Sequence, residues 1–255
     1  MAQMAENNGV FDQSASVYDL LYGEKDSEGE AEWVRQRLLR YGVEPGSSLL
    51  EFGSGTGRHA RIFADMGHPI TAVEPSTEML ERAIPHPRVN YVLGDTHSTR
   101  LPDKFGAVLA LFHVMSYHTR VQDAHNLFDT ASQHLNSGGL FGFDVWFTPA
   151  VHSLKPEVRE IEKHSKTASV RRIATPHEDV LHSLVTVRYS YTVLDRKTGH
   201  VSEFQEEHHM RHFTYTEIAL LAKAHGFSIV ESVEFLTENS PSRGTWGVWF
   251  TLEKQ

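Results

Sequence analysis

Apolar and polar positions follow a regular alternation over the first 145 residues. Short apolar runs bounded by glycine, proline or polar residues predict five strands, at 48–52, 70–74, 89–93, 106–112 and 140–145. Around them, apolar residues recur at helical spacing, as in segments 31–41 and 124–135. Repeated β-α units of this kind predict an α/β fold with a mostly parallel sheet, covered by helices on both faces. Ligands of such sheets bind outside the carboxyl ends of the strands.

The pattern changes after residue 145. Every second residue is apolar or aromatic from Val185 to Val193, and a turn at 195–199 leads into a second strand at about 201–213. These two strands predict an antiparallel insert. A helix at 215–225 follows, and two further β-type runs, at 227–235 and 245–252, are expected to complete the main sheet.

Composition narrows the class of protein. The 255 residues fit one enlarged domain or one domain with an insertion, and the absence of cysteine excludes disulfides, thiolate metal sites and cysteine nucleophiles. A net charge of −9, with no basic stripe, argues against nucleic acid as a partner. Residues 1–16 are polar, and no apolar run is long enough to span a bilayer, so we expect a cytoplasmic protein without a membrane partner. Residues 151–213 hold 10 Lys and Arg against 9 Asp and Glu, a balance that would suit an anionic small molecule.

A glycine-rich turn joins the first strand to the helix after it. Gly53, Gly55 and Gly57 alternate along this turn, and Glu51 lies on the strand just before them. Glycines let a ligand approach the backbone closely, because no Cβ is in the way and positive φ angles cost little. A nicotinamide dinucleotide site would have its third glycine where this chain has Arg58, and the phosphate-binding P-loop pattern is absent. The acid and the glycines together suit a cofactor that carries positive charge.

A second acid, Glu74, ends the next strand. A carboxylate in this position can accept hydrogen bonds from both hydroxyls of a ribose. The alternative is an ordinary surface or helix-capping acid, and the same alternative applies to Asp95.

Several motifs occur in order and together resemble class I S-adenosylmethionine-dependent methyltransferases. They lie at 51–57, 73–80, 94–95, 109–114 and 135–139. The resemblance covers about residues 47–145, and it implies a Rossmann-like sheet of seven strands and S-adenosyl-L-methionine as cofactor. It also assigns roles to residues that match the motifs. Glu51 and the backbone of the three glycines would hold the methionine part, Glu74 the ribose and Asp95 the adenine amino group. Met79 and Leu80 would contact the adenine face, and Phe112 would belong to the cofactor site.

A narrower resemblance extends beyond this core. Segments 17–22, 207–213 and 242–244 are similar to N,N-dimethyltransferases that act on nucleotide-linked amino sugars, whereas residues 147–180 depart from those enzymes. This resemblance implies a small-molecule acceptor with an amino group, and dimerisation of the enzyme. The parts it implies are an N-terminal lid and helix, a cofactor-binding core, an insert that forms the acceptor site and a C-terminal part of the core sheet, at 1–46, 47–145, 146–213 and 214–255.

The expected chemistry is an in-line displacement at an activated methyl group, for which a protonated sugar amine must first lose a proton. His208 is the first candidate for this base, because it shares a side of its strand with Phe204 and Met210 and should point inward. His113 is either part of the acceptor pocket or a core histidine. Tyr22 either covers the cofactor within the lid or packs as an amphipathic aromatic.

Three further assignments leave alternatives open. Arg243 would grip a phosphate or carboxylate, or form a surface ion pair, and Trp146 would form the pocket wall or the core. The cluster of histidines at 208, 209 and 212 suggests a metal site. However, residue 209 faces away from the other two on a strand and no carboxylate-rich loop accompanies them, so we expect no metal.

The sequence leaves functions other than N-methylation of an amino sugar open. Transfer to oxygen or carbon of another small metabolite is the first alternative, followed by a nicotinamide-dependent oxidoreductase and a cofactor-binding protein without catalysis. The Asn/Asp-Pro-Pro-Tyr signature for methylation of planar amide or base nitrogens is absent after the fourth strand, where the chain has Phe-His-Val-Met at 112–115.

Overall fold

The structure of the protein is a computed structural model that describes residues 13–255. It contains two compact units, each formed by two separate stretches of the chain. The sheet unit consists of Asp26–Lys155 and Arg211–Gln255, and the ribbon unit consists of the described residues up to Lys25 together with Pro156–Met210. Strand β9 (Val201–Phe213) passes from one unit into the other.

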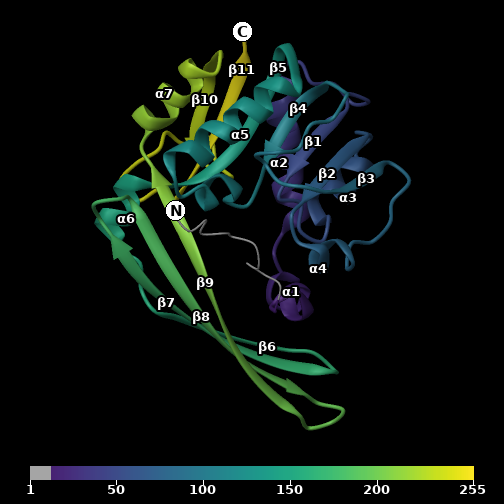
Figure 1. Ribbon diagram of the computed structural model, residues 1–255, viewed down its shortest axis with the longest axis vertical. Helices are drawn as coiled ribbons and strands as arrows, with labels where there is room; N and C mark the ends of the chain where they lie inside the picture. The colour runs from purple at the N-terminus through teal and green to yellow at the C-terminus, as the bar shows by residue number, and fades with distance from the viewer. Residues whose placement is uncertain (1–12) are drawn as a thin grey trace, which may run out of the picture. The chain divides into compact units, whose positions relative to one another are not determined.

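The sheet unit carries a central mixed β-sheet (Figure 1). Its strands are β1 (Leu49–Phe52), β2 (Ile70–Glu74), β3 (Val89–Leu93), β4 (Phe105–Ala110), β5 (Leu135–Phe147), β10 (Phe227–Glu234) and β11 (Gly247–Lys254). The first five run parallel in the order β3-β2-β1-β4-β5, after which β11 pairs antiparallel with β5 and β10 pairs antiparallel with β11. The last residues of β9 also pair with the end of β5. The predicted α/β fold, with seven mostly parallel strands, is confirmed within the described residues.

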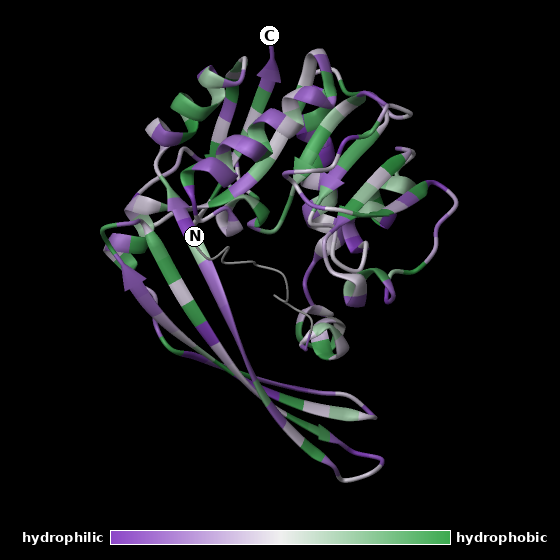
Figure 2. Ribbon diagram, viewed as in Figure 1, coloured by the Kyte–Doolittle hydropathy of each residue, from purple (hydrophilic) through white to green (hydrophobic). Residues whose placement is uncertain are grey.

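Helices cover both faces of this sheet. They are α2 (Ser27–Arg40), α3 (Arg58–Asp65), α4 (Thr77–Leu80), the 3₁₀ helix η1 (Val114–Tyr117), α5 (Val121–Gln133), α6 (Thr148–Leu154) and α7 (Tyr215–Ala224). Apolar residues of α5 and α7 form one core with one face of the strands, and those of α2 and α3 form a second core with the other face. The strands are mostly hydrophobic and the helices mixed (Figure 2), as expected for a sheet buried between two helical layers. Among the helices of residues 13–255, none is both long and apolar enough to cross a bilayer.

Strand four is shorter than predicted. The sequence predicted a strand at 106–112, but β4 ends at Ala110, and Phe112 and His113 have φ angles of 61° and 65°. An extended strand needs negative φ, so the apolar character of Leu111 and Phe112 gave the wrong end point. Strand β5 is longer than the predicted 140–145, because pairing with β4 begins at Leu135.

Close packing within the sheet predicts one stability effect. A Cβ added at Gly142 on β5 would lie 2.7 Å from two ring atoms of Trp249, which is fully buried. Overpacking of this kind costs about 1–3 kcal/mol, so Gly142→Ala should lower the thermal unfolding midpoint by several degrees. The control is Gly244→Ala, whose new Cβ would approach only Ser242 Oγ, at 3.8 Å. Equal midpoints for the wild type and Gly142→Ala would contradict this account of the packing.

The ribbon unit is an antiparallel meander with one helix. Its elements are α1 (Ala15–Tyr22), β6 (Arg159–His164), β7 (Ala168–Asp179), β8 (Leu184–Asp195) and the part of β9 up to Met210. Val17 and Leu21 of α1 form a small core with Val170 and Tyr191. The two strands predicted in the insert are present as β8 and β9, whereas α1, β6 and β7 were not predicted.

Candidate active site

The glycine turn leaves the carboxyl end of β1 with an open backbone. Gly53, Gly55 and Gly57 have φ angles of 67°, 57° and 72°, the left-handed region that favours glycine. A Cβ at Gly53 would collide with Val114 and one at Gly57 with Tyr91, while a Cβ at Gly55 would meet nothing within 4 Å. The outer glycines are therefore required by close packing, and the middle one presents its backbone to open space.

Two buried acids flank this turn, and they differ in their hydrogen bonding. Glu74 is tied to the protein: its Oε2 accepts from Gly55 N at 2.8 Å and its Oε1 from Ser76 N at 3.0 Å. Glu51 is 2% exposed, and its Oε2 has no hydrogen-bond partner among the described residues. Burial raises the pKa of Glu51 to about 8, and the negative charge of Glu74 contributes in the same direction.

A buried carboxyl oxygen without a partner is costly unless a donor or a cation joins it. Glu51 therefore fits a ligand with positive charge over the glycine turn. A carboxylate can accept about four hydrogen bonds, so Glu74 is chemically suited to the two hydroxyls of a ribose in addition to these backbone donors. By these observations the residues present fit S-adenosylmethionine.

The residues predicted for the adenine side lie on neighbouring elements of the same unit. Met79 is buried in α4, whose first turn is capped by Ser76 Oγ, which accepts from Met79 N at 3.2 Å. Asp95 follows β3 and accepts from the backbone nitrogens of His97 and Ser98 at 2.7 and 2.6 Å. Burial acts to raise the pKa of Asp95, but the hydrogen bonds from Ser98 and His97 outweigh it and hold the pKa below its ordinary value. Asp95 is thus ionised and able to accept a further hydrogen bond.

His113 lies at the carboxyl end of β4, next to an acid that was not predicted as a site residue. Asp144 on β5 is fully buried, and its Oδ2 lies 2.5 Å from His113 Nδ1. The His113 ring stacks on Phe112, with centroids 5.7 Å apart, and meets Trp146 edge to face at 6.1 Å. The available signal for Asp144 was a lone acid between the apolar residues Phe143 and Val145.

Trp146 and Arg243 also belong to the sheet unit. Trp146 N donates to Ser116 Oγ at 3.1 Å, and the indole packs against Trp246. The backbone oxygen of Arg243 accepts from Ser153 Oγ at 2.8 Å, and the residue is exposed. Their roles toward an acceptor stay predictions.

His208 and Tyr22 belong to the ribbon unit and are linked through Tyr189 and Arg172. His208 is buried with Met210 on one side of β9, as predicted, and its ring meets Tyr189 edge to face. The guanidinium of Arg172 lies over Tyr189 and donates to the hydroxyl of Tyr22 at 2.7 Å.

A second missed acid accompanies His208. Glu206 lies two residues earlier on the same side of the strand, with its Oε2 3.6 Å from His208 Nε2. Burial acts to raise the pKa of Glu206, but the contact with His208 and the hydrogen bond from Ser14 hold the pKa below its ordinary value. Its signal in the sequence was the two-residue spacing from His208.

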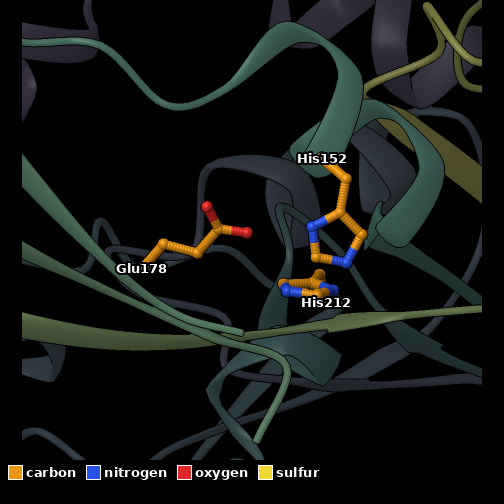
Figure 3. A group of neighbouring side chains, drawn as sticks. All are labelled: His152, Glu178 and His212. Carbon is orange, nitrogen blue, oxygen red and sulfur yellow. The ribbon is translucent and has the colours of Figure 1, made fainter. Parts of the chain in front are cut away.

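The three histidines considered for a metal have separate partners. His209 pairs with Thr186 Oγ1 at 3.0 Å in the ribbon unit. His212 lies in the sheet unit, where its Nδ1 is 2.9 Å from Thr148 Oγ1 and its ring meets His152 edge to face (Figure 3). Glu178, drawn in the same figure, belongs to the ribbon unit.

Comparison with known proteins identifies the family. A family model described as a methyltransferase domain matches residues 25–232. A dTDP-3-amino-3,4,6-trideoxy-alpha-D-glucopyranose N,N-dimethyltransferase of Streptomyces venezuelae is 27% identical over 238 residues, which cover 90% of this chain and 94% of the relative.

Two crystal structures share the fold. DesVI of Streptomyces venezuelae aligns with a TM-score of 0.80 and 23% identity, over 95% of this chain and 98% of its own. The sugar N-methyltransferase KedS8 of Streptoalloteichus sp. gives the same score and identity, over 94% and 93%. These matches agree with the predicted resemblance and oppose the nicotinamide and non-catalytic alternatives. With the open glycine turn and the unpartnered Glu51, they show that the chain belongs to the methyltransferase-domain family and is an S-adenosylmethionine-dependent methyltransferase.

Proposed function

We propose that the enzyme methylates the amino group of a nucleotide-linked amino sugar. The observation that carries this proposal is the similarity to the Streptomyces venezuelae N,N-dimethyltransferase over 90% of the chain, a length that must include part of the ribbon unit as well as the sheet unit. Cytoplasmic localisation, which was expected from the polar N-terminal residues and the lack of a long apolar run, and a homodimeric state, which the resemblance implies, belong to the same proposal.

The sheet unit would hold the cofactor at the carboxyl ends of β1 to β4. Glu51 would pair with the positively charged methionine part, and the backbone around Gly55 would come into direct contact with it. Glu74 would accept from the ribose hydroxyls. Met79, Leu80 and Phe112 would enclose the adenine, with Asp95 accepting from its amino group. When bound, S-adenosylmethionine supplies a methyl group on a positively charged sulfur, which needs no further activation by the protein.

The chain must therefore orient the acceptor and take a proton from it. His208 and His113 are the two candidates for the base, and each has a carboxylate beside it. We assign Arg243 to the anionic part of the acceptor, because its guanidinium can bind phosphate through two hydrogen bonds. Trp146 is assigned to the wall of the acceptor site.

A mass-shift experiment tests the acceptor class. Incubation with S-adenosylmethionine and dTDP-3-amino-3,4,6-trideoxy-α-D-glucose should add the mass of one methyl group and then of a second. The matched control is the same nucleotide sugar with a hydroxyl in place of the amino group, which should stay unchanged. Plain phenols, amines and carboxylates complete the set. Methylation of the hydroxyl control or of a phenol, without methylation of the amino sugar, would replace this proposal by an O- or C-methyltransferase.

A further inference from the structure

The chain leaves β4 through two successive left-handed residues. Phe112 and His113 have φ angles of 61° and 65°, and neither is glycine. Bulky residues rarely adopt this conformation, and it persists where the surrounding structure imposes it, most often at functional sites. The next residue, Val114, packs so closely on the glycine turn that a Cβ at Gly53 would lie 2.5 Å from its Cγ2. The strained segment therefore places His113 directly beside the turn that fits the cofactor.

Asp144 holds this segment in place. Its two carboxylate oxygens accept from His113 N at 3.2 and 3.1 Å, and Oδ2 also lies 2.5 Å from His113 Nδ1. The Asp144 side chain is fully buried, so it requires such partners to remain ionised. One carboxylate thus holds both the unusual backbone and the ring of His113.

This contact determines which ring nitrogen can take a proton. Because Nδ1 lies 2.5 Å from a carboxylate oxygen of Asp144, the carboxylate favours the neutral imidazole that carries its proton on Nδ1 and its lone pair on Nε2. The ring is held between Phe112 and Trp146, and the side chain of His113 is 24% exposed. A carboxylate beside Nδ1 and a partly exposed ring form the arrangement of a general base with its orienting acid.

His208 is less suited to act as a general base. Its side chain is 4% exposed, and Nε2 is the atom that faces Glu206. The ring also packs edge to face on Tyr189, at 4.7 Å. His118 is excluded in the same way, because Thr96 Oγ1 and Val114 O engage both of its ring nitrogens.

We propose that His113 is the general base of the methyl transfer and that Asp144 is its positioning residue. This inference rests on the proposed amino-sugar acceptor. The acceptor ammonium gives one proton to His113 Nε2, and the freed nitrogen lone pair forms a bond to the methyl carbon. The electrons of the carbon–sulfur bond pass to the sulfur, leaving a neutral thioether and a methylated ammonium. The His113 imidazolium then releases its proton to solvent.

Turnover of dTDP-3-amino-3,4,6-trideoxy-α-D-glucose tests the base. His113→Gly is the sharpest variant, since glycine adopts the left-handed backbone without strain and leaves space for a small molecule. Its kcat should fall about 10²–10⁴-fold, with binding of S-adenosylmethionine retained, and added imidazole should restore part of the rate. The kcat of Asp144→Asn should also fall. Added imidazole should not restore it, because His113 is still present in this variant. Full activity of His113→Gly, or a loss that imidazole does not relieve, would overturn the proposal.

The chain offers a matched control for the Asp144 variant. Asp179 and His182 form an exposed pair, with 2.7 Å between Oδ2 and Nδ1. Asp179→Asn makes the same chemical change to an aspartate–histidine pair outside the site, and its turnover should equal that of the wild type. A loss of the same size as for Asp144→Asn would show that the effect is not specific to the site and would overturn the positioning role.

A measurement without acceptor separates this inference from the proposed function. Ring-¹⁵N NMR of the full chain should show a signal of a histidine with a protonated Nδ1 and a free Nε2 that is assigned to His113 because it is lost in His113→Gly, and this signal should be altered in Asp144→Asn. If the wild type leaves the amino sugar unmethylated, the acceptor proposal fails, yet this signal still supports the Asp144–His113 pair. A His113 ring protonated on Nε2 alone would overturn the pair whatever the acceptor.

Discussion

Glu51→Gln is expected to make the protein more stable without cofactor and weaker in binding it. The pKa of Glu51 is about 8 in the fold, whereas the ordinary pKa of a glutamate is 4.5. Between these values the folded chain holds a proton that the unfolded chain releases, so the free energy of unfolding falls as the pH rises from 4.5 to 8. Each unit of pKa difference corresponds to about 1.4 kcal/mol, and the loss reaches several kcal/mol above pH 8. Glu51→Gln removes this loss of stability at high pH, because an amide does not ionise.

The same variant should lose the attraction for the methionine part. Hydrogen bonds to a charged group contribute about 1.5–3 kcal/mol, so the affinity for S-adenosylmethionine should fall about 10- to 150-fold. In the wild type, binding should release a proton from Glu51, and the affinity should rise with pH and level off above the pKa of about 8. This rise should be absent in the variant.

Calorimetry in buffers of different ionisation enthalpy would measure both affinity and proton release, and thermal unfolding at pH 5 and pH 8 would measure stability. Adenosine serves as the control ligand, because it lacks the methionine part and should bind both proteins equally. Unchanged affinity for S-adenosylmethionine in Glu51→Gln would remove Glu51 from the cofactor site.

Glu74→Ala should weaken both S-adenosylmethionine and adenosine. The substitution leaves the backbone nitrogens of Gly55 and Ser76 without their acceptor and removes the acceptor proposed for the ribose. With two charge-assisted hydrogen bonds to the ribose lost, we expect a fall in affinity of about 100-fold or more for either ligand. Loss of adenosine binding distinguishes this variant from Glu51→Gln.

Glu78→Gln is the control for Glu74. Glu78 also pairs with Ser76, whose Oγ lies 3.2 Å from Oε2, but it is exposed. Its substitution should leave both affinities unchanged. If Glu74→Ala binds adenosine as the wild type does, the ribose assignment is wrong and Glu74 serves only to hold the glycine turn.

The strands of the sheet unit were largely predictable, because the apolar runs in the sequence coincide with strands that are paired and buried in the sheet. The apolar runs of β1, β2 and β3 match the structure within one residue, since strands covered on both faces need continuous apolar side chains. The left-handed angles at Phe112 and His113 were not predictable, because an apolar run does not reveal where φ changes sign.

The strands of the ribbon unit were harder to predict from the sequence. In β6, only Ile161 and Lys163 are half-buried and the other residues are exposed, as expected for a strand that pairs on one side only, with β7. Such a segment carries little periodic signal. Asp144 was overlooked for a related reason, since its importance depends on a partner 31 residues earlier, brought near by the pairing of β4 with β5.

The ribbon unit is built from two stretches separated by residues 26–155, and this has a practical consequence for engineering. Val17 and Leu21 share a core with Val170 and Tyr191, and Ser14 N donates to Glu206 at 2.9 Å. A chimera that exchanged only Pro156–Met210 with a related enzyme would join a foreign meander to the native α1. Both stretches must therefore be transplanted together, and natural recombination at a single crossover point would meet the same obstacle.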